Sequence, residues 1–160
     1  GTHVLWGKND LVEIAKELSE IYPDTCYIVS FGNYAKKDEP VEKPTDNIFV
    51  YQYADYDTFL PKVDYIIHHG GTGILYNGIK FNKPSVIIPH DYDQFDYAVR
   101  AEIAEIGFPA SLKSRKSVID AVGKMLNKKE WKKLEKMSED FKKYNPSDVL
   151  KREIERLVGK

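Results

Sequence analysis

Short apolar runs alternate with segments of helical periodicity along most of this 160-residue chain. The runs are apolar throughout rather than at every second position, as expected for strands that helices cover on both faces. Between them, apolar residues recur every three or four positions, which is the period of an amphipathic helix. The alternation therefore predicts an α/β fold, a Rossmann-like doubly wound parallel sheet with right-handed crossovers.

The expected elements can be placed by residue number. Strands are predicted at His3–Trp6, Cys26–Phe31, Ile48–Tyr53, Tyr65–His68, Ser85–Ile88 and Pro109–Leu112. Helices are predicted at Asp10–Tyr22, Thr72–Lys80 and Gln94–Ile106 with Gly107 as its C-cap, followed by extra C-terminal helices at Ser117–Leu126, Glu130–Tyr144 and Ser147–Val158. The prolines and charges of residues 35–47 predict a surface loop.

Composition narrows the classes of partner and compartment. The net charge is −1 and no lysine-arginine run is flanked by aromatics, which argues against a nucleic-acid partner. No apolar run approaches the roughly 20 residues that span a bilayer, so no transmembrane segment is expected. The single cysteine, Cys26, excludes an intrachain disulfide framework and fits a cytoplasmic protein, and its apolar neighbours predict a buried, unreactive thiol.

A glycine-rich turn follows the predicted strand Tyr65–His68. The strand ends in His68-His69 and continues as Gly70-Gly71-Thr72-Gly73 into a helix. Glycines admit a close ligand, and a helix amino end offers unpaired N–H groups and a positive dipole, so the turn is a candidate phosphate site. The alternative is a tight strand–helix turn that needs glycine only for positive φ. The spacing matches neither a dinucleotide fingerprint nor a P-loop.

A second polar element, His90–Gln94, follows the next strand along the chain. Ligands of open α/β sheets bind at the carboxyl ends of strands, so this element is expected beside His69. Asp93 and Gln94 could accept and donate hydrogen bonds to the hydroxyls of a sugar. Taken alone, the segment is better explained as a helix start with Asp93 as N-cap.

The two elements together resemble the donor-binding signature of the UDP-glycosyltransferases (glycosyltransferase family 1), in particular the macrolide and sterol glucosyltransferase branch. The resemblance covers about 60 residues in the expected order and extends through the strand–helix pattern over most of the chain. Its motif residues are His68–Gly73, then Gly78, Pro84, Pro89 and Asp93-Gln94-Phe95. It implies the C-terminal half of a GT-B fold, with residues 1–160 forming a single nucleotide-sugar-binding domain and the N-terminal acceptor domain absent.

The resemblance also implies roles for single residues. The donor diphosphate would meet His69 and the backbone of Gly71, Thr72 and Gly73. The donor sugar would be held by Asp93 and Gln94. Tyr53 would stack on the base and the main chain of Ala54 would read its edge, while Asn77 falls at the ribose-binding position and His68 packs or orients the turn.

Four departures from the family pattern concern the donor. Residues 53–56 read Tyr-Ala-Asp-Tyr where the family usually has Trp-x-Pro-Gln. Ile74 replaces a hydroxyl residue, Asn77 replaces a glutamate, and Lys8 replaces a serine or threonine in the first loop. Lys8 is either a point charge near the diphosphate or an ordinary exposed lysine. UDP is the first choice of donor nucleotide and a deoxythymidine diphosphate the second.

The implied reaction is a metal-independent, inverting hexosyl transfer to an acceptor hydroxyl, with no cofactor beyond the nucleotide-sugar co-substrate. The Asp-x-Asp strings Asp55–Asp57 and Asp91–Asp93 are less compatible with a metal site, because Asp93 belongs to the Asp-Gln pair. The general base is expected on the missing domain, so this chain alone should transfer little or no sugar. Two alternatives remain open, namely a donor-binding subunit of a split, membrane-associated glycosyltransferase and a catalytically silent nucleotide-sugar-binding module.

Overall fold

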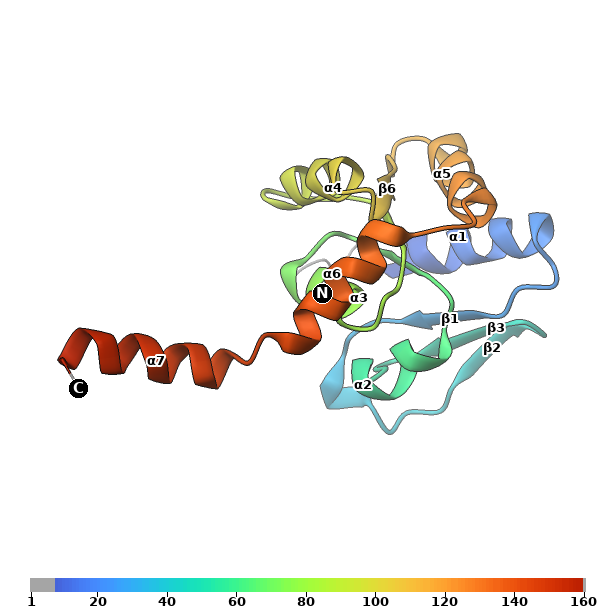
Figure 1. The fold of residues 1–160 in the computed structure, drawn as a ribbon. Coiled ribbons are helices and arrows are strands. Elements are labelled where there is room, and N and C mark those ends of the chain that lie inside the picture. The colour runs from blue at the N-terminus through green and yellow to red at the C-terminus, as the bar shows by residue number, and fades with distance from the viewer. Residues whose placement is uncertain (1–7, 160) are drawn as a thin grey trace.

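The computed structural model describes residues 8–159, with side chains from residue 10 onward (Figure 1). The strand predicted at His3–Trp6 lies outside the described residues. The strands within the described part are β1 (Tyr27–Ser30), β2 (Glu42–Thr45), β3 (Ile48–Tyr51), β4 (Ile66–His68), β5 (Ser85–Ile87) and β6 (Gly107–Pro109). The α-helices are α1 (Lys8–Ile21), α2 (Tyr56–Phe59), α3 (Thr72–Lys80), α4 (Gln94–Ile103), α5 (Arg115–Asn127), α6 (Lys132–Lys143) and α7 (Pro146–Val158).

The strands form two three-stranded sheets. In the first sheet the order is β1-β3-β2, with β1 and β3 parallel and β2 antiparallel. In the second sheet the order is β4-β5-β6 and all strands are parallel. In the second sheet each parallel connection passes through a helix, α3 or α4, because parallel neighbours need a long crossover. The predicted α/β fold with C-terminal helices is confirmed.

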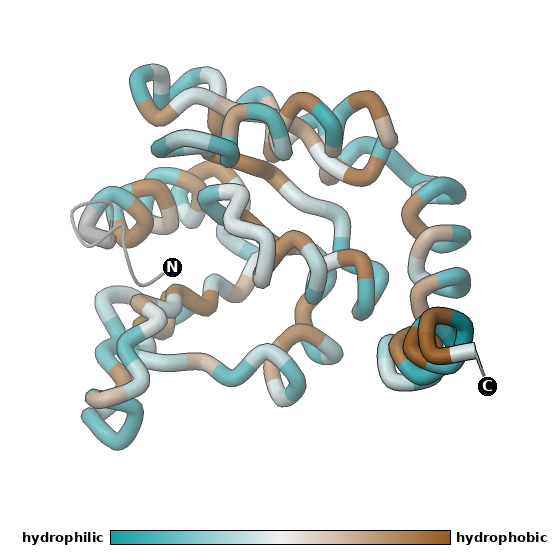
Figure 2. Tube along the Cα trace, turned by 90° about the vertical axis from the view of Figure 1, so that its left-hand side faces the viewer, coloured by the Kyte–Doolittle hydropathy of each residue, from teal (hydrophilic) through white to brown (hydrophobic). Residues whose placement is uncertain are grey.

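The central strand β5 explains why the apolar runs do not alternate. Val86 lies in a core cluster with residues of α1 and α5, whereas Ile87 lies in a second cluster with α4 and Leu134 of α6. Both side chains are fully buried, so each face of the strand is covered. Figure 2 shows the apolar stretches gathered along these inner segments.

Helix α1 packs on both sheets. Ile14 and Leu18 join the cluster of the second sheet, and Ala15 packs with Val29 and Ile48 of the first. Adjacent turns of one amphipathic helix thus face two sheets. This shared helix fixes where the carboxyl ends of β3 and β4 lie relative to each other.

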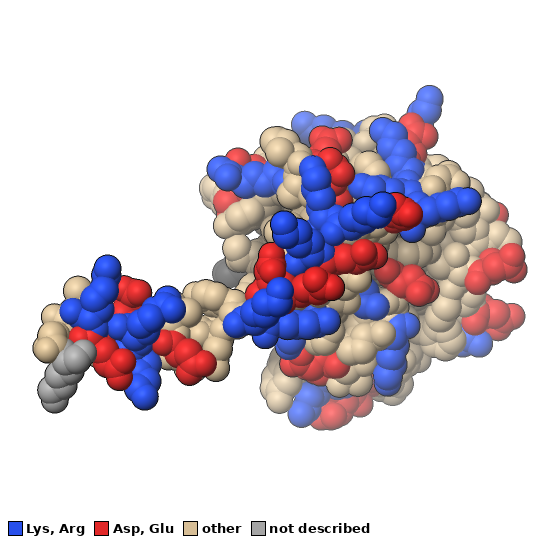
Figure 3. Space-filling model, in the orientation of Figure 1, with Lys and Arg blue, Asp and Glu red and all other residues tan. Residues whose placement is uncertain are grey.

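The C-terminal helices differ in how they are held. Helix α6 buries Leu134 and Ser138, and Ser138 Oγ donates to the carbonyl of Lys80 at the end of α3 (3.2 Å). Helix α7 buries none of its residues and projects away from the body (Figure 1). The charges on α7 and on the body in this view are of both signs and are interleaved (Figure 3).

The end of α4 and the start of β6 differ from the prediction. The helix ends at Ile103 rather than Ile106, and Glu105 has a positive φ of 58°. Gly107 is therefore not a C-cap but the first residue of β6, which spans Gly107–Pro109 rather than Pro109–Leu112. Glycine is needed there because a Cβ would lie 2.7 Å from the carbonyl oxygen of Ser85.

Two further predictions are corrected. Residues 42–45, expected in a loop, form the edge strand β2, whose four side chains are all exposed and therefore carry no apolar pattern. Cys26 is exposed rather than buried, because β1 begins one residue later, at Tyr27. Helix α7 is capped by Asn145, whose Oδ1 accepts from the N–H groups of residues 147 and 148.

Candidate functional site

The candidate site begins in the turn between β4 and α3. Strand β4 ends at His68, and α3 begins at Thr72 with Gly71 as its N-cap. No side chain caps this amino end, which leaves its N–H groups available to a ligand. Gly70 has a φ of +92°, a conformation that side chains rarely adopt.

The imidazole of His69 lies over the amino end of α3. A Cβ built on Gly71 would fall 2.5 Å from Nε2 of His69, so the ring occupies the space that a side chain at position 71 would need. At Gly73, by contrast, no atom lies within 4 Å of the Cβ position. The turn therefore places a ring nitrogen beside open backbone, which suits an anion.

Both histidines of the turn are neutral near pH 7. Burial is the largest cause that lowers the pKa of His69, to about 4. His68 is only 6 % exposed, and burial, with a smaller effect from His69, lowers its pKa to about 3. In the ligand-free protein the neutral imidazole of His69 can still donate an N–H to an anion.

The second polar element lies against the first, as predicted. A Cβ on Gly70 would come within 3.3 Å of the carbonyl oxygen of Gln94, so the turn touches the first residue of α4. The side chain of Gln94 organises its own loop, because Oε1 accepts from the N–H groups of His90 (2.9 Å) and Asp91 (3.3 Å). With Oε1 used in this way, the amide nitrogen of Gln94 is the part of the side chain that could donate to a ligand.

Asp93 does not cap α4 through its side chain. It stands at the N-cap position but has helical dihedrals and makes no side-chain hydrogen bond to the helix. The alternative of a helix start with Asp93 at the N-cap position is therefore confirmed, although the side chain does not make the capping bond. The carboxylate is exposed beside Gln94, which is compatible with the predicted contact to sugar hydroxyls.

The predicted base-binding residues lie at the carboxyl end of the first sheet. The rings of Tyr53 and Tyr34 meet edge to face, with centroids 5.1 Å apart. Both line an open hollow of about 430 Å³, together with Lys37, Asp38, Asp55, Thr58 and Phe59. An aromatic wall of this kind offers a stacking surface to a flat base.

Ala54 and Asn77 already have partners within the protein. The N–H of Ala54 donates to Ser30 Oγ (3.0 Å), so this N–H is not free for a base edge. Asn77 Nδ2 donates to the carbonyl of Gly73 (2.8 Å), which leaves Oδ1 as its acceptor for a ribose hydroxyl. Ile74 is buried against Leu60 and Ile66, which is why an apolar residue replaces the hydroxyl residue of the family pattern.

Two groups were missed by sequence reasoning. Tyr34 supports the ring of Tyr53, and Ser30 holds the backbone of Ala54. The only signal for Ser30 was a polar residue at the carboxyl end of a strand, and nothing marked Tyr34. The prediction for Lys8 is untested, because its side chain lies outside the described residues.

The first Asp-x-Asp string is used within the protein. Asp55 caps α2 by accepting from the N–H and hydroxyl of Thr58 (2.9 and 2.8 Å). Asp57 forms an ion pair with Lys80 (2.6 Å). In the part of the chain that the structure describes, no three histidine, cysteine or acidic residues are grouped as metal ligands.

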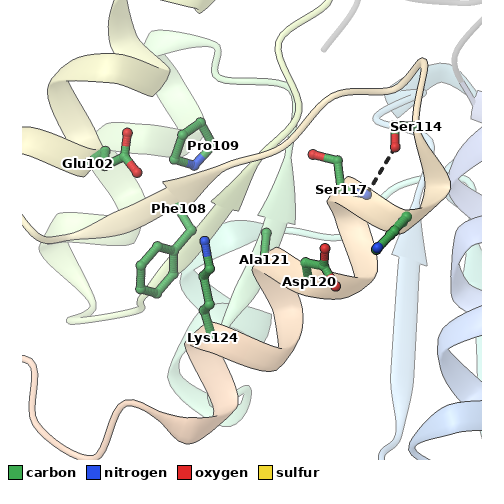
Figure 4. A pocket seen from close by; sticks show the side chains of 9 residues that line it. Glu102, Phe108, Pro109, Ser114, Ser117, Asp120, Ala121 and Lys124 are labelled. Atoms are coloured by element: carbon green, nitrogen blue, oxygen red, sulfur yellow. Dashed lines mark hydrogen bonds between the residues drawn. The ribbon is translucent and has the colours of Figure 1, made fainter.

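A second hollow of about 290 Å³ lies between β6 and α5, away from these residues (Figure 4). Its walls carry charges of both signs, from Lys116 and Lys124 and from Glu102 and Asp120. None of the predicted site residues lines it. It is therefore separate from the candidate site.

Comparison with known proteins decides the family. Residues 8–152 match the glycosyltransferase family 28 C-terminal domain. The chain belongs to this family. The prediction of a C-terminal GT-B glycosyltransferase domain is thereby confirmed, although the matching family carries the number 28 rather than 1.

Relatives and solved structures agree with that assignment. The domain is 28 % identical to UDP-glucosyltransferase A1 of Starmerella bombicola, over 99 % of this chain and 35 % of that protein. It is 33 % identical to the sterol 3-beta-glucosyltransferase of Saccharomyces cerevisiae (strain YJM789), over 57 % of this chain and 8 % of that protein. The solved glycotransferase of kitacinnamycin shares the fold, with a TM-score of 0.76 at 20 % identity over 91 % of this chain and 38 % of the other.

Both relatives are much longer than this domain. The domain spans about a third of the length of the first relative and less than a tenth of the second. No helix among residues 8–159 has the length and apolar character needed to cross a bilayer. For this chain, the activity of these longer relatives is a proposal, which is given below.

Proposed function

We propose that this domain binds a nucleotide-diphosphate sugar, with UDP as the preferred nucleotide, for inverting transfer of a hexosyl group to an acceptor hydroxyl. The observation that carries the proposal is the ring of His69 over the open amino end of α3, next to the loop that holds Asp93 and Gln94. In this arrangement the diphosphate lies against Gly71, Thr72 and Gly73, and the sugar reaches Asp93 and Gln94.

The proposed contribution of this domain to the reaction is electrostatic stabilisation of the leaving group. The acceptor hydroxyl attacks the anomeric carbon, the bond to the diphosphate oxygen breaks, and the nucleoside diphosphate leaves with both electrons. Helix-end N–H groups and the His69 N–H stabilise the negative charge that develops on the leaving oxygen. No metal or cofactor is part of this proposal, and Lys8 adds a positive charge if it faces the diphosphate.

The base lies against Tyr53, and Tyr34 holds that ring from the side. Ala54 reads the base edge through its carbonyl, because its N–H is bonded to Ser30. Asn77 Oδ1 accepts from the ribose. A deoxythymidine diphosphate is the second candidate nucleotide, supported by the fold likeness to the spinosyn rhamnosyltransferase SpnG, which was solved with thymidine diphosphate (TM-score 0.66, 20 % identity).

The proposed partner is an N-terminal acceptor-binding domain that supplies the general base, on the same chain or as a separate, membrane-associated subunit. The cytoplasm is the proposed compartment. We expect the domain alone to bind donor and to transfer little or no sugar. Donor binding that leads to no transfer with any such partner would instead identify a silent nucleotide-sugar-binding module.

The test is calorimetric titration with UDP, dTDP, GDP and ADP, with and without chelator, on the wild type and on His69→Ala. Selective binding of UDP or dTDP that persists with chelator and is lost in His69→Ala is the expected result. Uridine is the matched control ligand. It lacks the diphosphate, so its affinity should be the same for the wild type and His69→Ala. Equal UDP binding by the wild type and His69→Ala would contradict the assignment of the diphosphate site.

A further inference from the structure

His68 has no part in the contacts proposed above, yet it is the most enclosed polar side chain of the turn. Its exposed fraction is 6 %, whereas His69 beside it is half-buried. Its backbone carbonyl accepts from the N–H of Ile88 (2.8 Å), and its Nδ1 accepts from the N–H of Gly70 (3.0 Å). One residue therefore ties the end of β4 to the segment after β5 and also to the turn.

The bond to Gly70 fixes the turn at its most constrained point. Gly70 is buried and has a φ of +92°, and its N–H bonds to a side chain rather than to a neighbouring strand. A buried N–H without an acceptor is costly, and Nδ1 of His68 is the acceptor that the structure provides. Loss of that acceptor would favour a different path for the turn.

The turn has little freedom to move without disturbing the second element. A Cβ at Gly70 would lie 3.0 Å from Cγ2 of Ile87 and 3.3 Å from the carbonyl oxygen of Gln94. The backbone at Gly70 thus fits directly against α4. Since Gln94 Oε1 holds the loop that contains His90 and Asp91, a shift of Gly70 would reach the proposed sugar side as well.

We propose that His68 is a positioning residue for donor binding, which holds the Gly70 turn so that His69 covers Gly71 and the turn fits against Gln94. The inference rests on the proposed function, because it assigns His68 to the same site. His68 touches no donor atom in this scheme and acts through the backbone that it holds.

The hydrogen bonding of the His68 ring shows which of its two nitrogens holds the turn. Because Nδ1 accepts from Gly70, the proton of the neutral ring sits on Nε2. Nε2 is buried and has no hydrogen-bond partner among the residues that the structure describes, whereas Nδ1 accepts from Gly70. Burial lowers the pKa of His68 to about 3, which keeps Nδ1 unprotonated at physiological pH.

This distinction gives a matched pair of variants. In His68→Asn, Oδ1 stands two bonds from Cβ, as Nδ1 does, and can accept from Gly70. In His68→Gln the amide oxygen stands one bond farther out, at the place of Nε2, and cannot. His68→Leu removes the acceptor altogether.

The experiment measures UDP and uridine affinities of the full chain by calorimetry, and the exchange rate of the Gly70 amide proton by NMR. We expect His68→Asn to stay near the wild type, and His68→Gln and His68→Leu to lose about tenfold in UDP affinity with little change for uridine. The Gly70 amide should exchange slowly in the wild type and His68→Asn and faster in the other two.

Unchanged UDP affinity in His68→Gln and His68→Leu would overturn the proposal, as would an equal loss for UDP and uridine, which indicates general unfolding. Amide exchange is measured without ligand, so it reports on the conformation of the Gly70 turn even in a variant that binds UDP weakly. A wild type that binds no nucleoside diphosphate would overturn the proposed function, and the donor-binding role of His68 with it. Slow Gly70 exchange in all variants would refute the His68–Gly70 contact on its own.

Discussion

The diphosphate side of the proposed donor site, residues 68–73 and 90–94, is held by buried hydrogen bonds, tight glycine contacts and two neutral histidines. The base side, at the end of the first sheet, is an open hollow whose tyrosine rings meet only edge to face. The former is a preformed cradle, and the latter is a surface that can adapt to its ligand. A small substitution should therefore reduce ligand affinity more on the diphosphate side than on the base side.

The largest effect is expected from Gly71→Ala. The new Cβ would fall 2.5 Å from His69 Nε2 and displace the ring from the amino end of α3. We expect UDP affinity to fall about 100-fold, as a charge-assisted contact is lost together with the fit of the turn, while uridine affinity is unchanged. Calorimetry with both ligands measures this.

Gly73→Ala is a control for stability rather than for binding, because Gly73 itself lies against the proposed diphosphate. Nothing lies within 4 Å of its Cβ position, so the substitution adds a methyl group without moving His69. It should leave Tm unchanged or raise it, because alanine favours a helix. Wild-type UDP affinity in Gly71→Ala would show that the position of the ring does not matter.

On the base side, Tyr53→Ala should cost roughly tenfold in affinity for both UDP and uridine, because stacking on a base contributes about 1–3 kcal/mol. Tyr53→Phe keeps the ring and should retain most of the affinity. Tyr144→Ala, at an exposed tyrosine that follows α6, is the matched control and should bind as the wild type does. If Tyr53→Ala reduced UDP affinity but spared uridine, Tyr53 would belong to the diphosphate side.

Acid should loosen the diphosphate side before the base side. The folded-state pKa values of His69 (about 4) and His68 (about 3) lie below the unfolded value of 6.5. Below pH 6.5 the unfolded chain therefore binds more protons than the folded one, and stability falls as pH falls toward those values. The loss is at most about 1.4 kcal/mol per pH unit for each histidine, and less for His69, whose charge solvent screens.

Hydrogen exchange between pH 7 and pH 5, corrected for intrinsic rates, measures this effect by region. Protection should decrease more at residues 70–73 than at residues 51–54, because no histidine lies between residues 8 and 67. His69→Ala should reduce the difference. Equal loss of protection in both regions would mean that the two sides unfold as one unit.

The smallest effect is expected from Ser30→Ala. The hydroxyl of Ser30 accepts from the N–H of Ala54 (3.0 Å), and without it that N–H lacks its acceptor. A loss of about 1 kcal/mol, or roughly fivefold, should appear equally for UDP and uridine. Ser117→Ala removes a similar bond, to the N–H of Ser111, away from the site and should leave binding unchanged. Unchanged uridine affinity in Ser30→Ala would remove Ala54 from the base side.

The elements that were predicted well are those whose position follows from nearby residues in the sequence. Helix α3 spans Thr72–Lys80 as predicted, because a glycine turn, a helical apolar period and a downstream proline bound it on both sides. The strands β4 and β5 follow from apolar runs, since burial on both faces requires them. Strand β2 was missed because its side chains are all exposed, and an exposed edge strand imposes no pattern on its residues.

For the candidate site, the sequence by itself determined which residue types stand at the carboxyl ends of the strands and in what order. It identified the His69 turn and the Asp93-Gln94 loop as neighbours, because parallel strands end at one edge of the sheet. Only the tertiary structure decided that Gly70 fits against Gln94, that Tyr34 meets Tyr53, and that Ser30 holds Ala54. Those contacts join residues 19 to 24 positions apart, and their distances depend on how helices pack against the sheets rather than on any local period.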